Sequence, residues 1–559
     1  MNHYDAIVIG AGAAGIAAAR KFCESGLVRV VVLEARDRAG GRAHTSDALS
    51  VSGEGAKLDH GAQWIHGYSQ QHPLVQLASE FQRGHRRMPH STSETLLSDG
   101  RAVTASMSAN AQLRLANMRK RVKETAGRLS QDDDLSWSEA LAPICPDGDE
   151  PDKAVLNLHI YNSCENYEGA CLDHWSVKSW NMVTCVPGGN GDLDDGMGTL
   201  LGDAARNLQI LHGHIVHEVC YSNEEDTTLQ GVHVHCRTVQ GKVTYCAPRC
   251  VVTLPLGVLR AGHVEFCPPL GEAKSRAMAA LGTALMNKVE LMWHERWWPT
   301  SSFQIASLQS TPSMHPWPWF YEPPQVWDQN AGILVCYVTG HFARHVESIP
   351  QRDVVDSCLA SLRAAFPALV IPEPLASYRT CWGSDRFSQG SWTYFAVGSG
   401  PSDVHALRDP AGTNGCVAFA GEHTCDGSLY GLDMGTVHGA WLSGELAAAG
   451  LLQRLPKAVA ITDAQHRWRS TYRHTSDDVI PEISGYVPGT RVEVTSNPVE
   501  IEEELGADPD EGPHVHVAQG YCCKLGQIKH RSQWGWYHVT FDDGSASRWW
   551  TPYCLWVLT

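Results

Sequence analysis

The sequence contains no uninterrupted apolar run of about 18 or more residues, the length that a membrane-spanning helix needs. No basic segment followed by a short apolar run precedes the first ordered pattern at Tyr4, so we expect no secretory leader. The last three residues, VLT, match no peroxisomal or reticulum-retention signal. Together these absences predict a cytoplasmic protein that has no contact with a membrane.

Paired cysteine spacings are also missing. Of the 18 cysteines only Cys522 and Cys523 are adjacent, and no C-x-x-C occurs. In a chain without an export signal, this usage predicts reduced thiols. The two H-x-H pairs, His233-Val-His235 and His514-Val-His516, are typical of strands that carry histidines on one face, so we predict no metal site.

Positive charge is scarce. The chain has 44 Lys and Arg against 61 Asp and Glu, a formal net charge of −17. Direct nucleic-acid binding needs a basic surface and is therefore not expected. An acidic protein attracts cationic small molecules if its acids line the entrance to a site.

What the sequence does contain begins with an apolar run, YDAIVIG, that ends at Gly10. Gly12 and Gly15 complete a G-x-G-x-x-G pattern, an alanine-rich helical stretch follows, and a second apolar run ends at Glu34. This strand–turn–helix–strand order is the context of a dinucleotide-binding site. The glycines allow a tight turn, a close approach to a pyrophosphate and close helix–strand packing, while Glu34 is placed to accept from ribose hydroxyls.

The stretch LMNKVELMW, residues 285–293, raises a separate question. Strict alternation in a strand puts Met286, Lys288, Glu290 and Met292 on one face. A lysine between methionines either reaches water, pairs with Glu290 or serves chemistry. Because a buried unpaired ammonium is costly, the stretch alone favours the first two interpretations.

Four segments, in order, resemble conserved stretches of flavin-containing amine oxidases, the family of monoamine oxidases, polyamine oxidases and histone lysine demethylases. They are EARDRAGGR (34–42), DHGAQWIHG (59–67), VVTLPLGVL (251–259) and FAGEHTCDGSLYGLDMGTVHGAWLSGELAA (419–448). The polyamine and spermine oxidases are the nearest group by this pattern, and the resemblance extends to about residue 450.

The length predicts more than one domain. The resemblance implies an α/β fold with a Rossmann-like FAD-binding domain assembled from residues 1–75, 190–270 and 370–450. It implies a mixed-sheet substrate-binding domain from residues 76–189 and 271–369. Monoamine oxidases attach FAD through a cysteine at the position that matches Ser391 here, so non-covalent FAD is expected.

Carried over by position, the resemblance places Glu34 at the adenosine ribose, Arg36 on the adenine side and Arg42 at the pyrophosphate. It places Val216 against adenine and Glu422 at the ribityl or phosphate end. Thr436 and Val437 would meet the pyrimidine edge of the flavin at the start of a helix. The remaining expected cofactor-binding residues are Gly10, Gly12, Ala14, Gly15, Ala35, Gly41, Gly61, Ala62, Gln63, Trp64, Trp382 and Gly421.

The resemblance reverses the interpretation of Lys288, because family members use a lysine in an N-K-V strand to hold a water at flavin N5. The second implied catalytic residue is His66, in the sequence Trp64-Ile65-His66-Gly67, which is similar to the substrate-tunnel loop of polyamine oxidases. The expected reaction is oxidation of an amine with a neutral reacting nitrogen. A hydride passes to flavin N5, the imine is hydrolysed, and O2 reoxidises the flavin to give hydrogen peroxide.

The substrate walls are predicted from the same resemblance. Trp392 matches one aromatic wall, whereas the other wall falls at Asp433, within a loop about five residues longer than the family pattern. Tyr430 could fill the wall, or Asp433 could pair with a second ammonium. Glu165 and Glu168 are candidates for distal ammonium contacts, although solvated loop carboxylates are the favoured interpretation of both.

From Leu451 the chain turns polar, and we predict a linker over 451–485 followed by a small domain over 486–559. Short alternating runs separated by turns such as Asp543-Gly544 predict an all-β barrel that loosely resembles SH3-like or Tudor-type barrels. Its many aromatic residues either fill its core or form a cage for a peptide ligand such as methylated lysine.

The predicted function is oxidation of a polyamine, namely spermine, spermidine or an acetylated form, in polyamine catabolism. A histone lysine demethylase guided by the barrel, which could be nuclear, is one alternative. An L-amino-acid oxidase is another, although no arginine can be assigned to its substrate carboxylate. A binding module with an inert flavin domain is the alternative outside enzymology.

Overall fold

The structure is a computed structural model. It describes residues 2–47, 49, 57–88, 93–130, 133–142, 150–179, 188–222, 231–300, 302–309, 315–326, 332–427 and 432–454, together with strand segments 491–494, 525–531, 537–541, 548–550 and 555–557.

The N-terminal pattern folds into a parallel five-stranded sheet with the order β10-β3-β2-β14-β23. All residues of β2, β3, β14 and β23 are buried, as expected for a parallel sheet covered on both faces. This confirms the α/β unit that the glycine pattern predicted. The strands are β2 (Ala6–Ile9), β3 (Val30–Leu33), β10 (Ile210–Leu211), β14 (Cys250–Val252) and β23 (Val417–Phe419).

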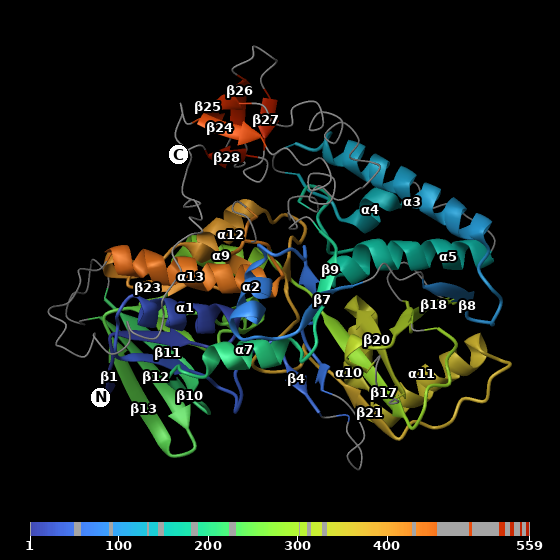
Figure 1. The fold of residues 1–559 in the computed structure, drawn as a ribbon, viewed down its shortest axis with the longest axis horizontal. Helices are drawn as coiled ribbons and strands as arrows, with labels where there is room; N and C mark the ends of the chain where they lie inside the picture. The colour runs from blue at the N-terminus through green and yellow to red at the C-terminus, as the bar shows by residue number, and fades with distance from the viewer. Residues whose placement is uncertain are drawn as a thin grey trace.

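Two helices cover one face of this sheet, α1 (Ala13–Glu24) and α13 (Val437–Arg454) (Figure 1). They pack so closely that a Cβ added to Gly444 would lie 2.0 Å from the carbonyl oxygen of Ala14. The last helix of the predicted cofactor domain therefore lies directly beside the first.

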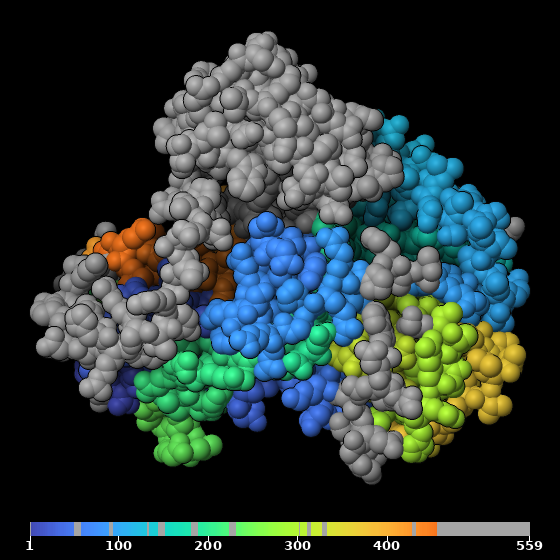
Figure 2. Space-filling model, viewed as in Figure 1, coloured from blue at the N-terminus to red at the C-terminus, as the bar shows by residue number. Residues whose placement is uncertain are grey.

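A second sheet covers the other face, in the order β1-β13-β12-β11-β15. Alternate residues of β2, Ile7 and Ile9, share one hydrophobic cluster with Val219 and Val234 of this sheet. The end of this sheet formed by β12 and β13, coloured green, lies at the molecular surface at the lower left of Figure 2. The strands are β1 (Asn2–His3), β11 (Ile215–Tyr221), β12 (Val232–Thr238), β13 (Gly241–Ala247) and β15 (Glu265–Cys267).

The predicted substrate-binding part is built on a six-stranded mixed sheet, β21-β17-β20-β19-β18-β8, in which only β8 and β18 are parallel. Helices α10 and α11 share its main cluster, and α3 and α5 share another with β8 and β18. The bounds are β8 (Glu94–Leu97), β17 (Met286–Trp293), β18 (Ser302–Ala306), β19 (Trp319–Tyr321), β20 (Gly332–Thr339), β21 (Ala376–Arg379), α3 (Ala105–Ala126), α5 (Glu150–Ile160), α10 (Gly340–Ser348) and α11 (Gln351–Ala365).

Shorter elements connect these layers. The strands are β4 (Thr45–Ser46), β5 (Leu58–Asp59), β6 (Ile65–His66), β7 (His85–Arg87), β9 (Asn190–Leu193), β16 (Gly282–Thr283) and β22 (Thr393–Tyr394). The helices are α2 (Pro73–Glu80), α4 (Trp137–Leu141), the π-helix η1 (Tyr161–Glu165), α6 (Asn166–Glu168), α7 (Met197–Ala205), α8 (Leu256–Arg260), α9 (Glu272–Ala280), η2 (Pro324–Val326), α12 (Pro401–Arg408), η3 (Thr413–Gly415) and η4 (Glu422–Thr424).

Among the described residues, three strand pairings cross the predicted division of the chain: β21 with β17, β22 with β16, and β7 with β9. β21 lies within 370–450, which was assigned to the cofactor domain, but it pairs with β17 in the six-stranded sheet. Leu291 and Met292 of β17 are its direct neighbours there. The other domain limits remain predictions.

The C-terminal segment contributes a five-stranded antiparallel sheet, β27-β26-β25-β24-β28. Its strands are β24 (Arg491–Val494), β25 (Leu525–Arg531), β26 (Tyr537–Phe541), β27 (Arg548–Trp550) and β28 (Leu555–Val557). The SH3-like or Tudor-type barrel remains a prediction. Within the described part of the chain, no helix is long and apolar enough to span a membrane.

Candidate active site

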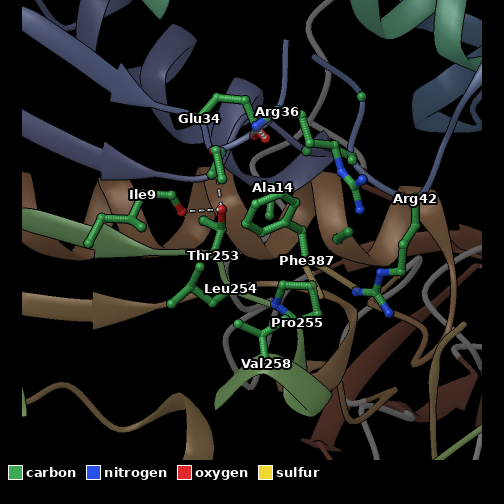
Figure 3. A pocket seen from close by; sticks show the side chains of 18 of the residues that line it. Ile9, Ala14, Glu34, Arg36, Arg42, Thr253, Leu254, Pro255, Val258 and Phe387 are labelled. Carbon is green, nitrogen blue, oxygen red and sulfur yellow. Dashed lines mark hydrogen bonds between the residues drawn. The ribbon is translucent and has the colours of Figure 1, made fainter. Parts of the chain in front are cut away.

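A cavity of about 430 Å³ opens where the parallel strands of the first sheet end. It is lined by the loop after β2, the end of β3, the segment after β14 and the start of α13 (Figure 3). The carboxyl ends of parallel strands are where α/β folds bind nucleotides, and a volume of this size is typical of small-molecule sites. The fold therefore places one candidate cofactor site here.

Most of the predicted cofactor-binding residues line this cavity. They are Gly10, Gly12, Ala14, Glu34, Ala35, Arg36, Gly41, Arg42, Ala62, Val216, Gly421, Glu422, Thr436 and Val437. Five others do not line it: Gly15, Gly61, Gln63, Trp64 and Trp382. Gly15 packs against the glycine loop, since an added Cβ would lie 1.8 Å from the carbonyl oxygen of Gly10. Trp382 is buried in the core of the six-stranded sheet.

The glycine loop forms a cradle for a bound group. Gly10 has φ +99°, a conformation that glycine adopts readily. Gly12 has an ordinary φ of −78°, and a Cβ added there would meet no atom closer than the Cα of Gly41, at 4.0 Å. The space beside Gly12 therefore belongs to the cavity, and a larger side chain would fill it.

We expect Gly12→Val to fold but to lose cofactor. The side chain has room within the protein, yet it would occupy the cavity, and overpacking of this kind lowers affinity roughly 10- to 100-fold. The measurement is the ratio of flavin to protein absorbance after purification, beside the thermal unfolding midpoint. Gly15→Val is the contrasting variant, because its Cβ meets backbone and should lower stability as well. A wild-type flavin ratio in Gly12→Val would contradict the expectation.

Glu34 connects the glycine loop to the end of β3. Its carboxylate accepts hydrogen bonds from the backbone N–H groups of Ala11 (2.7 Å) and Arg36 (2.8 Å), and its side chain is buried. The carboxylate lines the cavity, so its remaining lone pairs can accept from hydroxyl groups of a ligand.

Arg36 is tied to a distant loop. Its guanidinium donates two hydrogen bonds to Asp385 (2.9 and 2.7 Å) and one to Ser388 (2.9 Å), and it lies 5.4 Å from the centre of the Phe387 ring. Burial would raise the pKa of Asp385, but the Arg36 contacts lower it overall. Arg36 thus fixes the loop that carries Phe387, a cavity-lining residue that sequence analysis missed.

Arg42 and Glu422 form an ion pair of 2.9 Å at the cavity wall. Arg42 also donates to the carbonyl oxygen of Ser391 (2.8 Å). Glu422 accepts further hydrogen bonds from Thr393 and from the N–H of Gly435. Burial alone would raise the pKa of Glu422, but the Arg42 guanidinium, His423 and the backbone N–H of Thr393 lower it overall. The ion pair holds the Arg42 guanidinium in place beside the cavity.

The start of α13 points at the same cavity. Thr436 and Val437 line it, and the Thr436 hydroxyl accepts the N–H of Gly439 (3.0 Å) while donating to the carbonyl of Asp433 (2.8 Å). Free N–H groups at the first turn of a helix favour negative charge. This end of the cavity therefore suits an electron-rich ring edge or an anion.

Lys288 is buried and points toward the loop after β5. Its Nζ donates to the carbonyl oxygen of Asp59 and to Oε1 of Gln63 (3.1 Å). Gln63 also accepts from the hydroxyl of Tyr321 (3.0 Å), while its amide nitrogen is buried with no acceptor among the described residues. This loop continues through Ala62, which lines the cavity.

The ion pair between Lys288 and Glu290 is not formed. Both lie on the face that the alternation predicted, but Glu290 pairs with Nδ1 of His60 at 3.0 Å. His60 comes from the other part of the fold, 230 positions away in the chain. The structure thus removes both simple explanations of Lys288, since its ammonium is buried and forms no ion pair with a carboxylate side chain of the described residues.

His66 is accessible to solvent, yet the surrounding protein desolvates it and lowers the pKa of its imidazole. The hydrogen bond from its Nδ1 to Oδ1 of Asn190 (2.9 Å) acts in the opposite direction. A side chain that is accessible but crowded by protein lies in a concavity. His66 therefore stays a candidate for contact with substrate.

The two predicted aromatic walls have different outcomes. The Trp392 ring lies between Gly169 and Gly435, with added Cβ atoms 2.6 and 3.0 Å from it, and Gly435 lines the cavity. Tyr430 lies outside the described residues. Asp433 is buried, and its carboxylate pairs with His438 at 2.9 Å. It is therefore already engaged within the protein and not placed to pair with a substrate ammonium.

Glu165 and Glu168 are not solvated loop carboxylates, which corrects the favoured interpretation. They end the π-helix η1 and the short α6, and both are buried. Burial raises the pKa of each to about 8, although Glu165 accepts the N–H of Leu172 (3.2 Å). Glu168 directly precedes Gly169, whose backbone packs on Trp392.

Sequence analysis missed several lining residues. Residues 253–255, which follow β14, are among them. The Thr253 hydroxyl donates to the carbonyl of Ile9 (2.7 Å) and holds the glycine loop. Position after a buried parallel strand was the available signal. Phe387 and His263 also line the cavity, and no local pattern marks them.

Comparison with known proteins agrees with this geometry. The profile of the family described as flavin containing amine oxidoreductase matches residues 13–452. A lysine-specific histone demethylase 1 homolog of Arabidopsis thaliana is 30% identical over 466 residues, 80% of this chain and 52% of that protein. Polyamine oxidase 5 of Oryza sativa subsp. japonica is 27% identical over 476 residues, 82% of this chain and 89% of that protein.

The chain spans about half the length of the demethylase homologues that it matches. Among solved structures, a putrescine oxidase bound to putrescine has a TM-score of 0.61 at 19% identity, over 81% of this chain and 99% of that one. At this identity the likeness concerns the fold alone.

Proposed function

Because the chain belongs to the family of flavin-containing amine oxidoreductases, we propose that it is an FAD-dependent oxidase of polyamines such as spermine, spermidine or an acetylated form. The flavin cofactor and the class of amine substrates follow from the family. FAD as the particular flavin, its non-covalent attachment and the polyamine are the proposed parts.

Non-covalent FAD is supported by the lining of the cavity. Glu34, Arg42 and the start of α13 are spaced along one cavity, as a ribose, a pyrophosphate and a flavin ring require. No cysteine is among its described lining residues. At the position of the expected attachment, the Ser391 hydroxyl is engaged with the backbone of Met286, donating to its O and accepting its N–H at 2.9 Å each.

When bound, the flavin supplies two-electron oxidation of the amine and reduction of O2. The residues of the chain orient the amine and the flavin through hydrogen bonds and packing. Lys288 uses two of its three N–H donors on Asp59 and Gln63, and no described residue accepts the third. We assign this third donor to a water molecule next to the reacting groups. His66 and Trp392 are assigned to contacts with the substrate.

The observation that carries the polyamine assignment is the pair of buried carboxyl groups, Glu165 and Glu168. Nothing among the described residues hydrogen bonds to the carboxyl group of Glu168, and burial alone raises its pKa to about 8. A distal ammonium group arriving with the substrate would favour the ionised form. A polyamine carries such a group at a distance from the nitrogen that reacts, whereas a simple monoamine does not.

Glu168→Gln should therefore weaken polyamine binding in a pH-dependent way. In the wild type the KM for spermine should fall as pH rises from about 6 to 9, because the carboxylate forms over this window. The variant cannot ionise at this position, so its KM should fall less steeply with pH than that of the wild type and exceed the wild-type KM roughly 10- to 100-fold at pH 9. Steady-state peroxide release across this pH range measures both.

Two comparisons keep this test specific. A monoamine of similar length lacks the distal ammonium, so its KM should respond little to Glu168→Gln. Glu165→Gln should have a smaller effect, because the amide oxygen can still accept the N–H of Leu172. Equal KM values for spermine in Glu168→Gln and wild type at pH 9 would remove Glu168 from the substrate site.

A second candidate, oxidation of methylated lysine in a protein, is supported by the 30% identity to demethylase homologues. An anaerobic panel of amines separates the candidates, scored by loss of the oxidised flavin absorbance. Spermine, spermidine, acetylated polyamines, a methyl-lysine peptide and L-amino acids belong in it. Bleaching by the methyl-lysine peptide but not by polyamines would overturn the proposed substrate, and bleaching by none would leave the flavin domain a binding module.

A further inference from the structure

The outer face of the sheet β1-β13-β12-β11-β15 carries an unusual set of side chains. The inner residues of its strands, such as Val219 and Val234, are buried against the parallel sheet. The alternate residues point the other way. On β11 and β12 these include Glu218, Cys220, His233 and His235, and all four are partly accessible.

Strand register brings thiol and imidazole groups together on this face. Cys220 is the direct neighbour of His233 on one side and of Cys267 on the other. His233 in turn neighbours Cys246, whose Sγ lies 3.5 Å from Nδ1 of His233. One row across the sheet therefore reads Cys246, His233, Cys220 and Cys267, three cysteines and one histidine.

The next row adds a carboxylate and a second imidazole. Glu218 pairs with His235 across β11 and β12, and their ligand atoms and the Cys220 sulfur all lie within 4.8 Å of one another. Cys220 also interacts with the side chains of both Glu218 and Cys267. Three potential ligands thus lie close together on β11 and β12, and Cys267, the neighbour of Cys220 on β15, offers a fourth.

We propose that this outer face binds a zinc-type divalent cation through four side chains: Glu218, Cys220, His235 and Cys267. Zinc prefers four tetrahedral ligands drawn from cysteine, histidine and carboxylate. Each Zn–S bond forms as the thiol proton leaves to solvent, so the cation replaces two protons. The segment around His235 contains none of the other three ligands, but the strand register places Glu218 opposite His235, with Cys220 close to both.

The neighbours of the four proposed ligands are those expected around a metal site. Nδ1 of His235 hydrogen bonds to the Thr244 hydroxyl at 2.9 Å, which leaves Nε2 for a metal ion. Histidine ligands generally have such an outer partner, which holds the ring in orientation. The ligands also lie on strands with fixed pairing, which holds them in place before metal arrives.

Another cluster, Cys171, Asp173 and His341, has ligand atoms equally close but is less suited. The Cys171 sulfur already accepts the backbone N–H of His341 (3.2 Å) and is packed against Gly340. It is therefore committed to holding the start of α10.

The test uses the full-length, flavin-loaded protein after chelator treatment under reducing conditions. Zn2+ binding is measured by calorimetry, and Cd2+ is added in parallel because its ultraviolet charge-transfer band reports thiolate ligands. We expect one site with two thiolates in the wild type. The double variant Cys220→Ser/Cys267→Ser should lose the Cd2+ band. Its Zn2+ affinity should fall more than 100-fold, because loss of an outer partner alone costs roughly 10- to 100-fold. Thr244→Val removes such an outer partner and should lower Zn2+ affinity about tenfold.

Cys23→Ser is the matched control, because Cys23 is an exposed thiol on α1 and its loss should change neither signal. Unchanged flavin absorbance in each variant shows that the fold is retained. Wild-type affinity and an intact Cd2+ band in the Cys220/Cys267 double variant would overturn the proposal, as would a wild type that binds no Zn2+ at micromolar concentration. If Cys246→Ser lost Zn2+ binding while the Cys220/Cys267 double variant kept it, the site would lie at Cys246 and His233, and the proposal would be overturned as well.

Discussion

Lys288→Met is expected to lower turnover roughly 100- to 1000-fold while the flavin stays bound. This is the range observed when one preorganised charged or hydrogen-bonding group is removed from a reaction centre. Methionine is close to lysine in volume, so the buried space that Lys288 fills in β17 remains occupied. What is lost is the ammonium that donates to the carbonyl of Asp59 and to Gln63 and has one donor left.

Stopped-flow absorbance resolves the effect, because reduction by amine and reoxidation by O2 are recorded separately. A loss confined to one of the two steps assigns the third N–H donor of Lys288 to that step. The flavin-to-protein ratio is measured on the same samples. Unaltered rates in both steps would remove Lys288 from the mechanism.

Lys274→Met is a matched control for this experiment. Lys274 is a second buried lysine, and its Nζ donates to the backbone carbonyls of Ala406, Leu407 and Asp409 at 2.6–2.7 Å. Its burial lowers its pKa to about 8. Because this ammonium caps the end of α12, its loss should lower the unfolding midpoint but leave turnover of the folded enzyme near the wild-type rate.

Local sequence patterns predicted those parts of the site that are formed by residues close together in the sequence. The glycine loop, Glu34 and the start of α13 each depend on residues within a few positions of one another, and all line the cavity. The alternation in β17 likewise placed Lys288 and Glu290 on one face. In each case the physical cause, a turn, a helix end or a strand, is encoded by neighbouring residues.

Pairings between distant segments could not be predicted in the same way. Arg36 pairs with Asp385 across 349 positions, and Glu290 pairs with His60 across 230. Nothing in either short segment specifies its partner. From the sequence, Glu290 was the nearest carboxylate that could pair with Lys288. In the structure Glu290 pairs with His60, and Lys288 donates to the backbone carbonyl of Asp59.

Burial of polar residues was the other failure of local reasoning. The segment containing Glu165 and Glu168 is rich in polar residues, which usually predicts exposure. In the structure it is a π-helix followed by a helical turn, and both carboxyl groups are buried. Functional sites are where such costly burial is most often retained.

Glu422→Ala is expected to release the flavin. Glu422 is buried, and its removal would leave the Arg42 guanidinium without its counter-ion and the N–H groups of Thr393 and Gly435 without an acceptor. Breaking one side of a buried ion pair costs roughly 3–5 kcal/mol. That cost falls on folding stability, and the guanidinium that Glu422 held in place beside the cavity is no longer positioned for the ligand, so flavin affinity should fall about 100-fold, which corresponds to about 2.8 kcal/mol. Fluorescence of released flavin on dilution measures this directly.

Glu422→Gln separates the charge of this residue from its hydrogen bonds. The amide oxygen can still accept from Thr393 and Gly435, so any loss that remains reports the charge opposite Arg42. The sign of the pH dependence tests the same point. The folded-state pKa of Glu422 is lowered overall, so its contribution is complete above the unfolded-state value and is lost as pH falls through the folded-state value. Acid release of flavin at the same pH in wild type and Glu422→Gln would show that Arg42 is held by other contacts, and the ion pair would then not position the guanidinium at the cavity.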